Sequence, residues 1–142
     1  MQYHPFKIST LHTGLERHIM AHIIDVKTFK DSRGILTVLD NVVPFEIKRL
    51  FYIYAVDDTE RGGHRHHETH QAAICIKGAC KITNNNDKTV EVFDLDSPEK
   101  CLILLPEDWH VMYDFTPDAI LLVLASTAFD PKDYIYEPYD TL

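Results

Sequence analysis

Short stretches in which hydrophobic and polar residues alternate, each bounded by turn-forming residues, recur along most of the chain. Alternation with a period of two places every second side chain on the same face of an extended strand. The stretches are also rich in β-branched and aromatic residues, which favour strands. We therefore expect strands at residues 23–29, 35–39, 47–56, 70–76, 79–83, 89–93, 101–105, 109–113 and 119–126.

The connections between these stretches predict tight turns. Lys77-Gly78 and the run of Asn and Asp over residues 84–87 suit hairpins, because Gly, Asn and Asp tolerate positive φ. No helical period persists for twelve residues, and only residues 131–134 suggest a short helix. The pattern therefore predicts an all-β chain folded as an antiparallel sandwich or barrel of the jelly-roll kind.

Length and composition fit one such domain. The chain has 142 residues, of which 45% are hydrophobic and 11% aromatic, enough to bury a core of its own. Residues 1–20 show no clear periodicity, and we interpret them as an N-terminal leader. The folded domain is expected to occupy residues 21–142.

The charge balance narrows the possible partners. A formal net charge of −8 argues against binding to nucleic acid or to a negatively charged membrane surface. A small anionic ligand stays possible if a few arginines converge on one pocket.

The three cysteines, Cys75, Cys80 and Cys101, are odd in number and form no Cys-x-x-Cys pair, so we predict buried, reduced thiols. With no signal-peptide or membrane-span pattern, we expect a soluble, cytoplasmic protein.

Residues 61–70 contain four of the nine histidines, directly after an Arg-Gly-Gly turn that permits close approach of the backbone to a ligand. Histidine changes its charge near neutral pH and is also the commonest metal ligand, so the cluster predicts proton transfer or metal binding. On an extended strand, alternation would place His64, His66, Glu68 and His70 on one face.

A metal site is the first alternative. A His-x-His pair with a third ligand and a distant histidine is the arrangement of metal sites in cupin barrels, and His110 supplies the distant histidine. Iron or manganese sites of this kind normally add a carboxylate, whereas the residue four positions after His66 is His70. This departure favours proton transfer, although a metal-dependent cupin and a solvent-facing polar loop both stay open.

Several separated blocks carry a resemblance to a known family. They are residues 31–34, 44–49, 52–53, Arg61-Gly62-x-His64-x-His66, Gln71, Gly78, residues 95–98, Pro106-x-x-Trp109-His110-x-Met112-x-Asp114-Phe115 and residues 123–126. In this order they resemble the nucleotide-sugar 3,4-ketoisomerases, small cupin proteins related to the C-terminal part of WxcM-like proteins. The similarity runs from about residue 22 to the Asp133-Tyr134-Ile135 segment.

The resemblance implies a single-domain cupin barrel that needs no metal or other cofactor and acts as a homodimer. It implies an isomerase that converts dTDP-4-keto-6-deoxy-D-glucose to a dTDP-3-keto-6-deoxyhexose by moving the carbonyl from C4 to C3. The product would enter deoxyamino-sugar biosynthesis, as for lipopolysaccharide or S-layer glycans, after a transaminase. The gluco or galacto configuration at C4 stays open.

The resemblance also assigns residues. We expect His64 to remove the C3 proton and His66 to move or orient protons beside it, with the reverse order open; such acid–base help is worth about 10²–10⁴-fold. Arg33, Arg49 and Arg61 are candidates for the diphosphate, because the planar guanidinium suits phosphate oxygens. The other predicted substrate-binding residues are Tyr52, Gln71, Trp109 and His110.

The chain departs from the family at two positions, His70, where members often carry Glu, and Gly63, where they often carry a bulky residue. Neither departure touches the paired histidines. Two further alternatives stay open beside the metal-dependent cupin. One is a 3,5-epimerase acting on the same sugar, and the other is a cupin that binds a nucleotide sugar without turnover.

Overall fold

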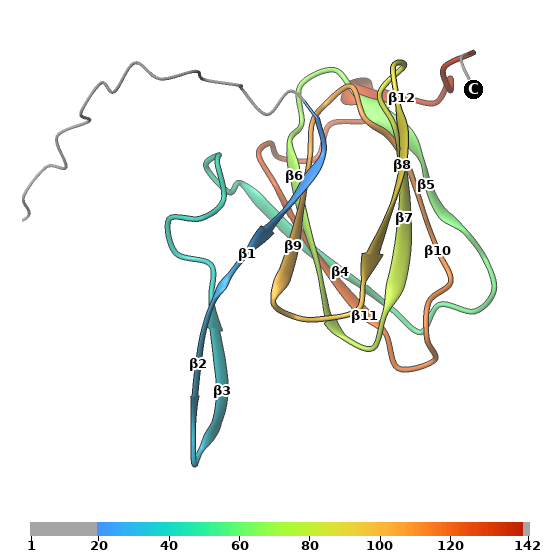
Figure 1. The fold of residues 1–142 in the computed structure, drawn as a ribbon. Helices are drawn as coiled ribbons and strands as arrows, with labels where there is room; N and C mark the ends of the chain where they lie inside the picture. Colours follow the sequence, from blue (N-terminus) through green and yellow to red (C-terminus); the bar gives the residue numbers. More distant parts are fainter. Residues whose placement is uncertain (1–19, 141–142) are drawn as a thin grey trace, which may run out of the picture.

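The computed structural model describes residues 20–140, which form an almost entirely β structure (Figure 1). The predicted leader lies, except for Met20, outside the described residues. The elements are β1 (His22–Asp25), β2 (Lys27–Asp31), β3 (Gly34–Val38), β4 (Arg49–Tyr54), β5 (Arg61–His66), β6 (Gln71–Lys77), β7 (Cys80–Asn85), β8 (Val90–Leu95), β9 (Lys100–Leu104), β10 (Trp109–Tyr113), β11 (Ile120–Ala125), the 3₁₀ turn η1 (Pro131–Asp133) and β12 (Tyr134–Ile135).

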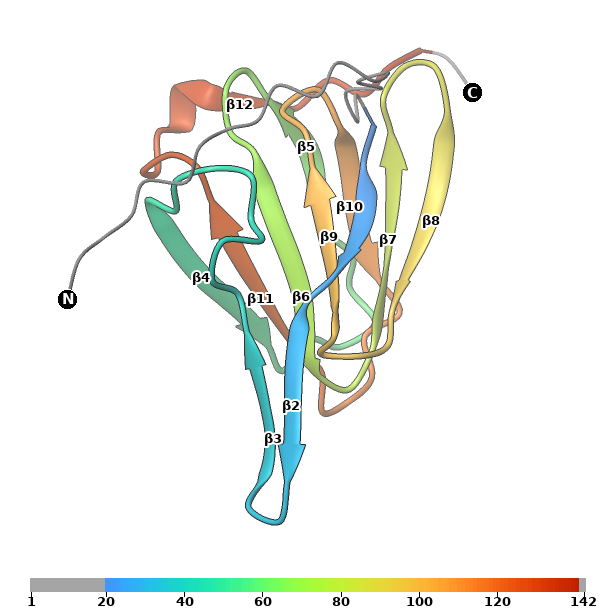
Figure 2. The same cartoon turned by 60° about the vertical axis from the view of Figure 1, so that its left-hand side comes forward.

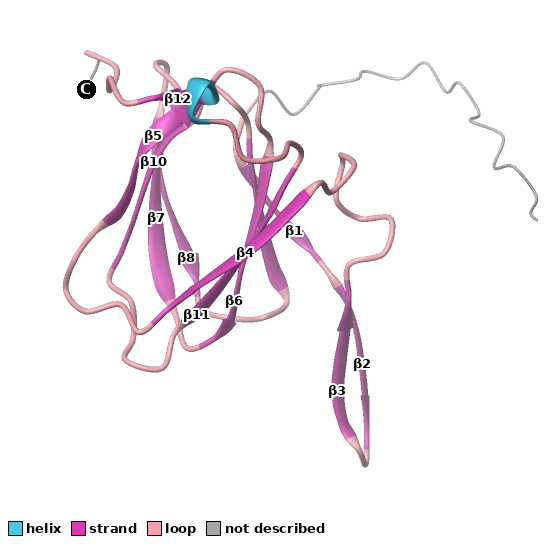
Figure 3. Cartoon of the chain, turned by 180° about the vertical axis from the view of Figure 1, so that it is seen from behind, coloured by secondary structure: helices cyan, strands magenta, loops and turns pink. Residues whose placement is uncertain are grey.

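Two five-stranded antiparallel sheets face each other. One has the strand order β1-β9-β6-β11-β4 and the other β12-β5-β10-β7-β8. From β4 onward the chain crosses repeatedly between the sheets, which together enclose a barrel-like interior (Figure 3). This arrangement confirms the predicted jelly roll.

Alternate side chains of the two sheets form the core between them. The buried set includes Ala73 and Cys75 of β6, Ile82 of β7, Leu102 of β9 and Leu121 of β11. All three cysteines are buried and free, as predicted. Within residues 20–140, no helix is both long and apolar enough to cross a membrane.

The strand expected at residues 23–29 is two strands. The chain changes partners at Val26, which is buried, so β1 pairs with β9 while β2 pairs only with β3. The β2–β3 hairpin, called the arm below (residues 27–38), projects from the barrel (Figure 2). Period-two alternation continues across Val26, which is why the sequence does not reveal the change of partner.

The strand through the histidine cluster is confirmed only as far as His66. Beyond it the backbone N–H of His67 donates to the Asp133 carbonyl oxygen at 2.9 Å, and the N–H of Glu68 donates to Asp133 Oδ1 at 2.8 Å. These bonds turn the chain away from the extended path. The prediction that Glu68 and His70 share the face of the histidine pair is therefore wrong.

The C-terminal segment packs against the end of β5, where the histidines lie. The short helix expected near residues 131–134 is the 3₁₀ turn η1, and it leads directly into β12, which pairs with β5 in the register Tyr134↔His66. A two-residue strand is too short to show alternation, so the sequence did not predict it. Its pairing brings Tyr134 beside the histidines.

Candidate active site

A cavity of about 140 Å³ lies between the two sheets and beside β12. Four strands and the C-terminal segment contribute to its wall, so residues distant in the sequence meet there. Its lining residues are Phe51, Ile53, Arg61, Gly62, His64, Gln71, His110, Met112 and Tyr134.

Three histidine rings cluster at this cavity. The ring centroids of His64 and His66 are 5.0 Å apart, and His110 lies 4.9 Å from His64 and 6.0 Å from His66. The cluster arises because β10 pairs with β5 in the register His110↔His64. The structure therefore brings together the predicted pair and the predicted distant histidine.

Gly62 allows β5 to approach β10 at this point. Its φ is +84°, and a Cβ there would lie 2.7 Å from the carbonyl oxygen of His110, too close for any other residue. The pairing shifts register at the same place, between His110 and Val111. Gly62 therefore lets two strands approach each other, and it also lines the cavity, so the expected approach of its backbone to a ligand stays a prediction.

Burial keeps the three imidazoles neutral. It lowers the pKa of His64 below the ordinary histidine value, and Arg49 lowers that pKa further. Burial and the neighbouring His64 lower the pKa of His66 to about 4 and that of His110 to about 3. Neutral imidazoles are proton acceptors at pH 7, as a base on carbon requires.

The tautomer of His110 is fixed by the backbone. Its Nδ1–H donates to the carbonyl oxygen of Asp108 at 3.1 Å, because a carbonyl oxygen only accepts. Nε2 of His110 is therefore an acceptor, and it is buried without a partner among the described residues, as is Nε2 of His66. Within residues 20–140, no three His, Cys, Asp or Glu side chains are arranged to hold a metal ion.

Tyr134 is a site residue that the sequence did not predict. Its ring centroid lies 4.8 Å from those of both His64 and His66. Its hydroxyl accepts a hydrogen bond from Nη1 of Arg49 at 3.3 Å. The only sequence signal for it is its place at the end of the segment that resembles the ketoisomerases.

Four of the predicted substrate-binding residues gather at the cavity. Arg61, Gln71 and His110 line it, and Arg49 reaches it through Tyr134. Gln71 is buried, and its side-chain oxygen has no partner among the described residues. Such a group is costly to bury unless a ligand pairs with it.

Tyr52 and Trp109 face away from the cavity. On β4 the inward residues are Phe51 and Ile53, so Tyr52, which is 60% exposed, lies on the outer face. Trp109 directly precedes the inward His110 on β10 and is therefore on the opposite face of that strand. The structure thus does not bring either predicted residue to the cavity of its own chain.

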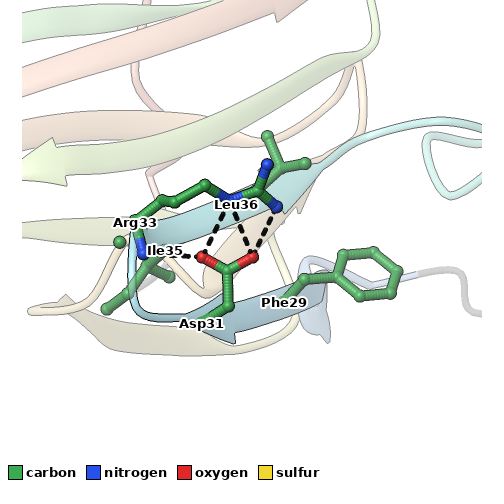
Figure 4. Close-up of a pocket in the computed structure, with 6 residues that line it drawn as sticks. Phe29, Asp31, Arg33, Ile35 and Leu36 are labelled. Atoms are coloured by element: carbon green, nitrogen blue, oxygen red, sulfur yellow. Dashed lines mark hydrogen bonds and ion pairs between the residues drawn. The ribbon is translucent and has the colours of Figure 1, made fainter.

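Arg33 lies at the tip of the arm (Figure 4). Its guanidinium pairs with Asp31, with Nη2 2.6 Å from Oδ2, and the Arg33 side chain is 88% exposed. That pairing holds the pKa of the Asp31 carboxyl below its usual value. The arm points away from the end of the barrel where β12 lies (Figures 1 and 2), so the structure does not bring Arg33 to its own cavity.

The fold is thus that of a cupin, a jelly-roll barrel, and the neutral histidines His64 and His110 line its cavity. The family model described as WxcM-like, C-terminal (FdtA) matches residues 20–141. The chain belongs to this family.

Three relatives illustrate the similarity. The chain is 37% identical over 121 residues to a TDP-4-oxo-6-deoxy-α-D-glucose-3,4-oxoisomerase of Aneurinibacillus thermoaerophilus, covering 83% of this chain and 86% of the relative. A histidine-to-asparagine mutant of the 3,4-ketoisomerase QdtA of Thermoanaerobacterium thermosaccharolyticum, in complex with TDP-4-keto-6-deoxyglucose, superposes with a TM-score of 0.79 at 38% identity, covering 82% and 87% of the two chains. The TDP-quinovose 3,4-ketoisomerase WlaRB of Campylobacter jejuni has a TM-score of 0.79 at 37% identity, covering 82% and 92%.

The lowered pKa of His66 predicts acid sensitivity of the fold. An unfolded histidine takes up a proton near pH 6.5 but folded His66 only near pH 4, so the unfolded chain binds more protons between these values and acid destabilises the fold. Asp108 opposes this below about pH 6, because burial raises its pKa to about 6. As the pH falls, the variant His66→Gln should lose less unfolding free energy than the wild type, by up to about 1.4 kcal/mol for each pH unit. Urea denaturation from pH 7 to pH 4.5 measures this.

The matched control is His67→Gln, at an exposed position next in the chain. It should leave the pH dependence as in the wild type. An identical slope for His66→Gln and the wild type would show that His66 is not held neutral by burial.

Proposed function

We propose that this protein is an enzyme that isomerises dTDP-4-keto-6-deoxy-D-glucose to a dTDP-3-keto-6-deoxyhexose. The observation that carries the proposal is the cavity lined by His64, with the ring of His66 directly behind it and the pKa values of both imidazoles lowered by burial. It stands in a chain whose relatives are named 3,4-ketoisomerases, one of them bound to TDP-4-keto-6-deoxyglucose.

The chemistry needs a proton moved between two neighbouring carbons. The C3 proton is acidic because C4 is a carbonyl, and a neutral imidazole removes it to leave an enediolate across C3 and C4. Protonation at C4 and loss of the O3 proton then give the 3-keto sugar. Preorganised donors beside the oxygens lower the barrier by stabilising the charge that builds there.

The two histidines differ in access to the cavity. His64 is half-buried and lines the wall, whereas His66 is 3% exposed and lies behind it. We therefore assign His64 as the base at C3 and His66 as the partner that orients it or exchanges its proton. His110, with Nε2 as an acceptor, suits a sugar hydroxyl.

The substrate-binding roles of the remaining residues follow their positions. Arg61 lines the cavity and Arg49 stands beside it, so their guanidinium groups are the candidates for the diphosphate. The unpaired amide oxygen of Gln71 would accept a hydrogen bond from the sugar. Arg33 would reach a cavity only in another copy of the chain.

A homodimer would explain why the arm projects from the barrel with exposed apolar side chains. A two-stranded hairpin is marginal by itself in water, and this one exposes Phe29, Ile35 and Leu36 at 50%, 65% and 62%. The sheet β4-β11-β6 carries a second apolar surface, a groove of about 450 Å³ whose lining includes Tyr52 and Leu122. We assign the arm of one copy to the surface of the other, which would cover both sets of apolar side chains and carry Arg33 to the partner.

The cellular setting is also part of the proposal. Three buried, free cysteines suit a reducing compartment, and we assign the enzyme to the cytoplasm, where its nucleotide-sugar substrate would be made. The reaction as written is an internal proton shift, and it balances without a cofactor.

The assignment of the histidines predicts a loss of activity without a loss of fold. His64→Ala and His66→Ala should each lower kcat by about 10²-fold or more, because general acid–base catalysis is removed. The measurement is the rate of 3-keto product formation by NMR, with circular dichroism as the test of folding. The control is His67→Ala, which should retain full activity. Wild-type rates in both folded variants would contradict the assignment.

If the arm holds the homodimer together, changing the apolar residues of the arm should lower the mass of the protein in solution from two chains to one. The wild-type protein should sediment at twice the mass of one chain. The double variant Phe29→Ser, Leu36→Ser should sediment as one chain, because it removes the apolar pair that faces out of the arm. Val92→Ser, at an exposed apolar position on β8, is the control and should stay dimeric. A single-chain mass for the wild type at micromolar concentration would overturn this part of the proposal.

A further inference from the structure

Tyr134 carries a hydroxyl group at the cavity whose presence neither ring packing nor the proposed role of the histidines explains. Its ring is in contact with both His64 and His66, and together with His64 it lines the cavity. An apolar ring would make the same ring contacts. The hydroxyl is the part of the residue that packing does not explain.

The hydrogen bond from Arg49 fixes how that hydroxyl is used. Nη1 of Arg49 donates to the Tyr134 oxygen, so the oxygen is the acceptor and its own O–H is left to donate elsewhere. A hydrogen bond from a cation polarises the hydroxyl and makes its O–H a stronger donor. The guanidinium would also stabilise the oxygen after it has given up its proton.

The proposed reaction contains two proton transfers, and the histidines account for one of them. A proton leaves C3 and a proton arrives at C4, which is the transfer assigned to His64 with His66. In addition O3 loses a proton and O4 gains one. O3 and O4 sit on adjacent carbons, so one hydroxyl group placed between them would serve both.

We propose that Tyr134 is a catalytic residue that carries the proton between the two sugar oxygens, with its hydroxyl held and polarised by Arg49. This inference rests on the proposed isomerase function. As His64 takes the C3 proton, Tyr134 gives its own proton to O4, which leaves a neutral enediol, an imidazolium and a tyrosinate beside Arg49. The tyrosinate then takes the proton of O3 while C4 is protonated from the imidazolium, and both residues return to their starting forms.

The atoms balance in this scheme. One C–H bond and one O–H bond break, one of each forms, and the carbonyl moves from C4 to C3 without an oxidant or a reductant. The scheme also avoids building a full negative charge on the enediolate, because O4 is protonated as the C3 proton leaves.

The test removes the hydroxyl and keeps the ring. Tyr134→Phe retains the contacts with both histidines, and its kcat should fall by about 10²-fold or more while dTDP affinity stays at the wild-type value. The matched control is Tyr136→Phe, the same change on an exposed ring that stacks 6.1 Å from Tyr134. It should leave kcat unchanged. Steady-state kinetics and dTDP titration calorimetry give the two readouts.

Two outcomes would overturn the inference. If Tyr134→Phe turns over as fast as Tyr136→Phe, the hydroxyl carries no proton. If Tyr134→Phe loses kcat and dTDP affinity together, the hydroxyl only maintains the site. A wild-type enzyme that forms no 3-keto sugar would instead refute the proposed function, so the two failures are distinguishable.

Discussion

The close pairing of β5 with β10 at Gly62 is the constraint on which the site depends. Only a residue without a Cβ fits against the His110 carbonyl there, and that approach places His110 beside His64. Burial of the three imidazoles is the largest cause of their lowered pKa values. The pairing of β5 with β10 thus brings together histidines that burial keeps neutral.

The C-terminal segment supplies the part of the site that the barrel strands lack. Pairing of β12 with β5 is anchored by Asp133, whose backbone and side chain accept hydrogen bonds from His67, Glu68 and Thr69. These bonds end β5 at His66 and set Tyr134 against the histidine pair. The short strand β12 thus follows the segment that ends β5, and it adds to the site the hydroxyl of Tyr134 and, through that hydroxyl, Arg49.

Much of the fold followed from the sequence, because period-two alternation and turn residues are local signals. The strand at residues 109–113 is predicted correctly, and so is the placement of His64 and His66 side by side on one strand. The faces of two other candidates also follow from alternation. With Arg49 inward, alternation places Tyr52 outward, and Trp109 and His110 occupy opposite faces of β10 as neighbours. Arg33 and Tyr134 depend on tertiary pairing, which leaves no periodic trace.

The proposed reaction moves a proton between C3 and C4 and leaves C5 untouched. An NMR time course of the wild-type protein with dTDP-4-keto-6-deoxy-D-glucose in deuterated buffer tests it most directly. We expect loss of the C3 proton signal, a new carbinol centre at C4, a 3-keto carbonyl and no deuterium at C5. Deuterium at both C3 and C5 with the carbonyl still at C4 would identify an epimerase, and an unchanged substrate would leave only a binding protein. Either result would refute the proposed 3,4-ketoisomerase activity.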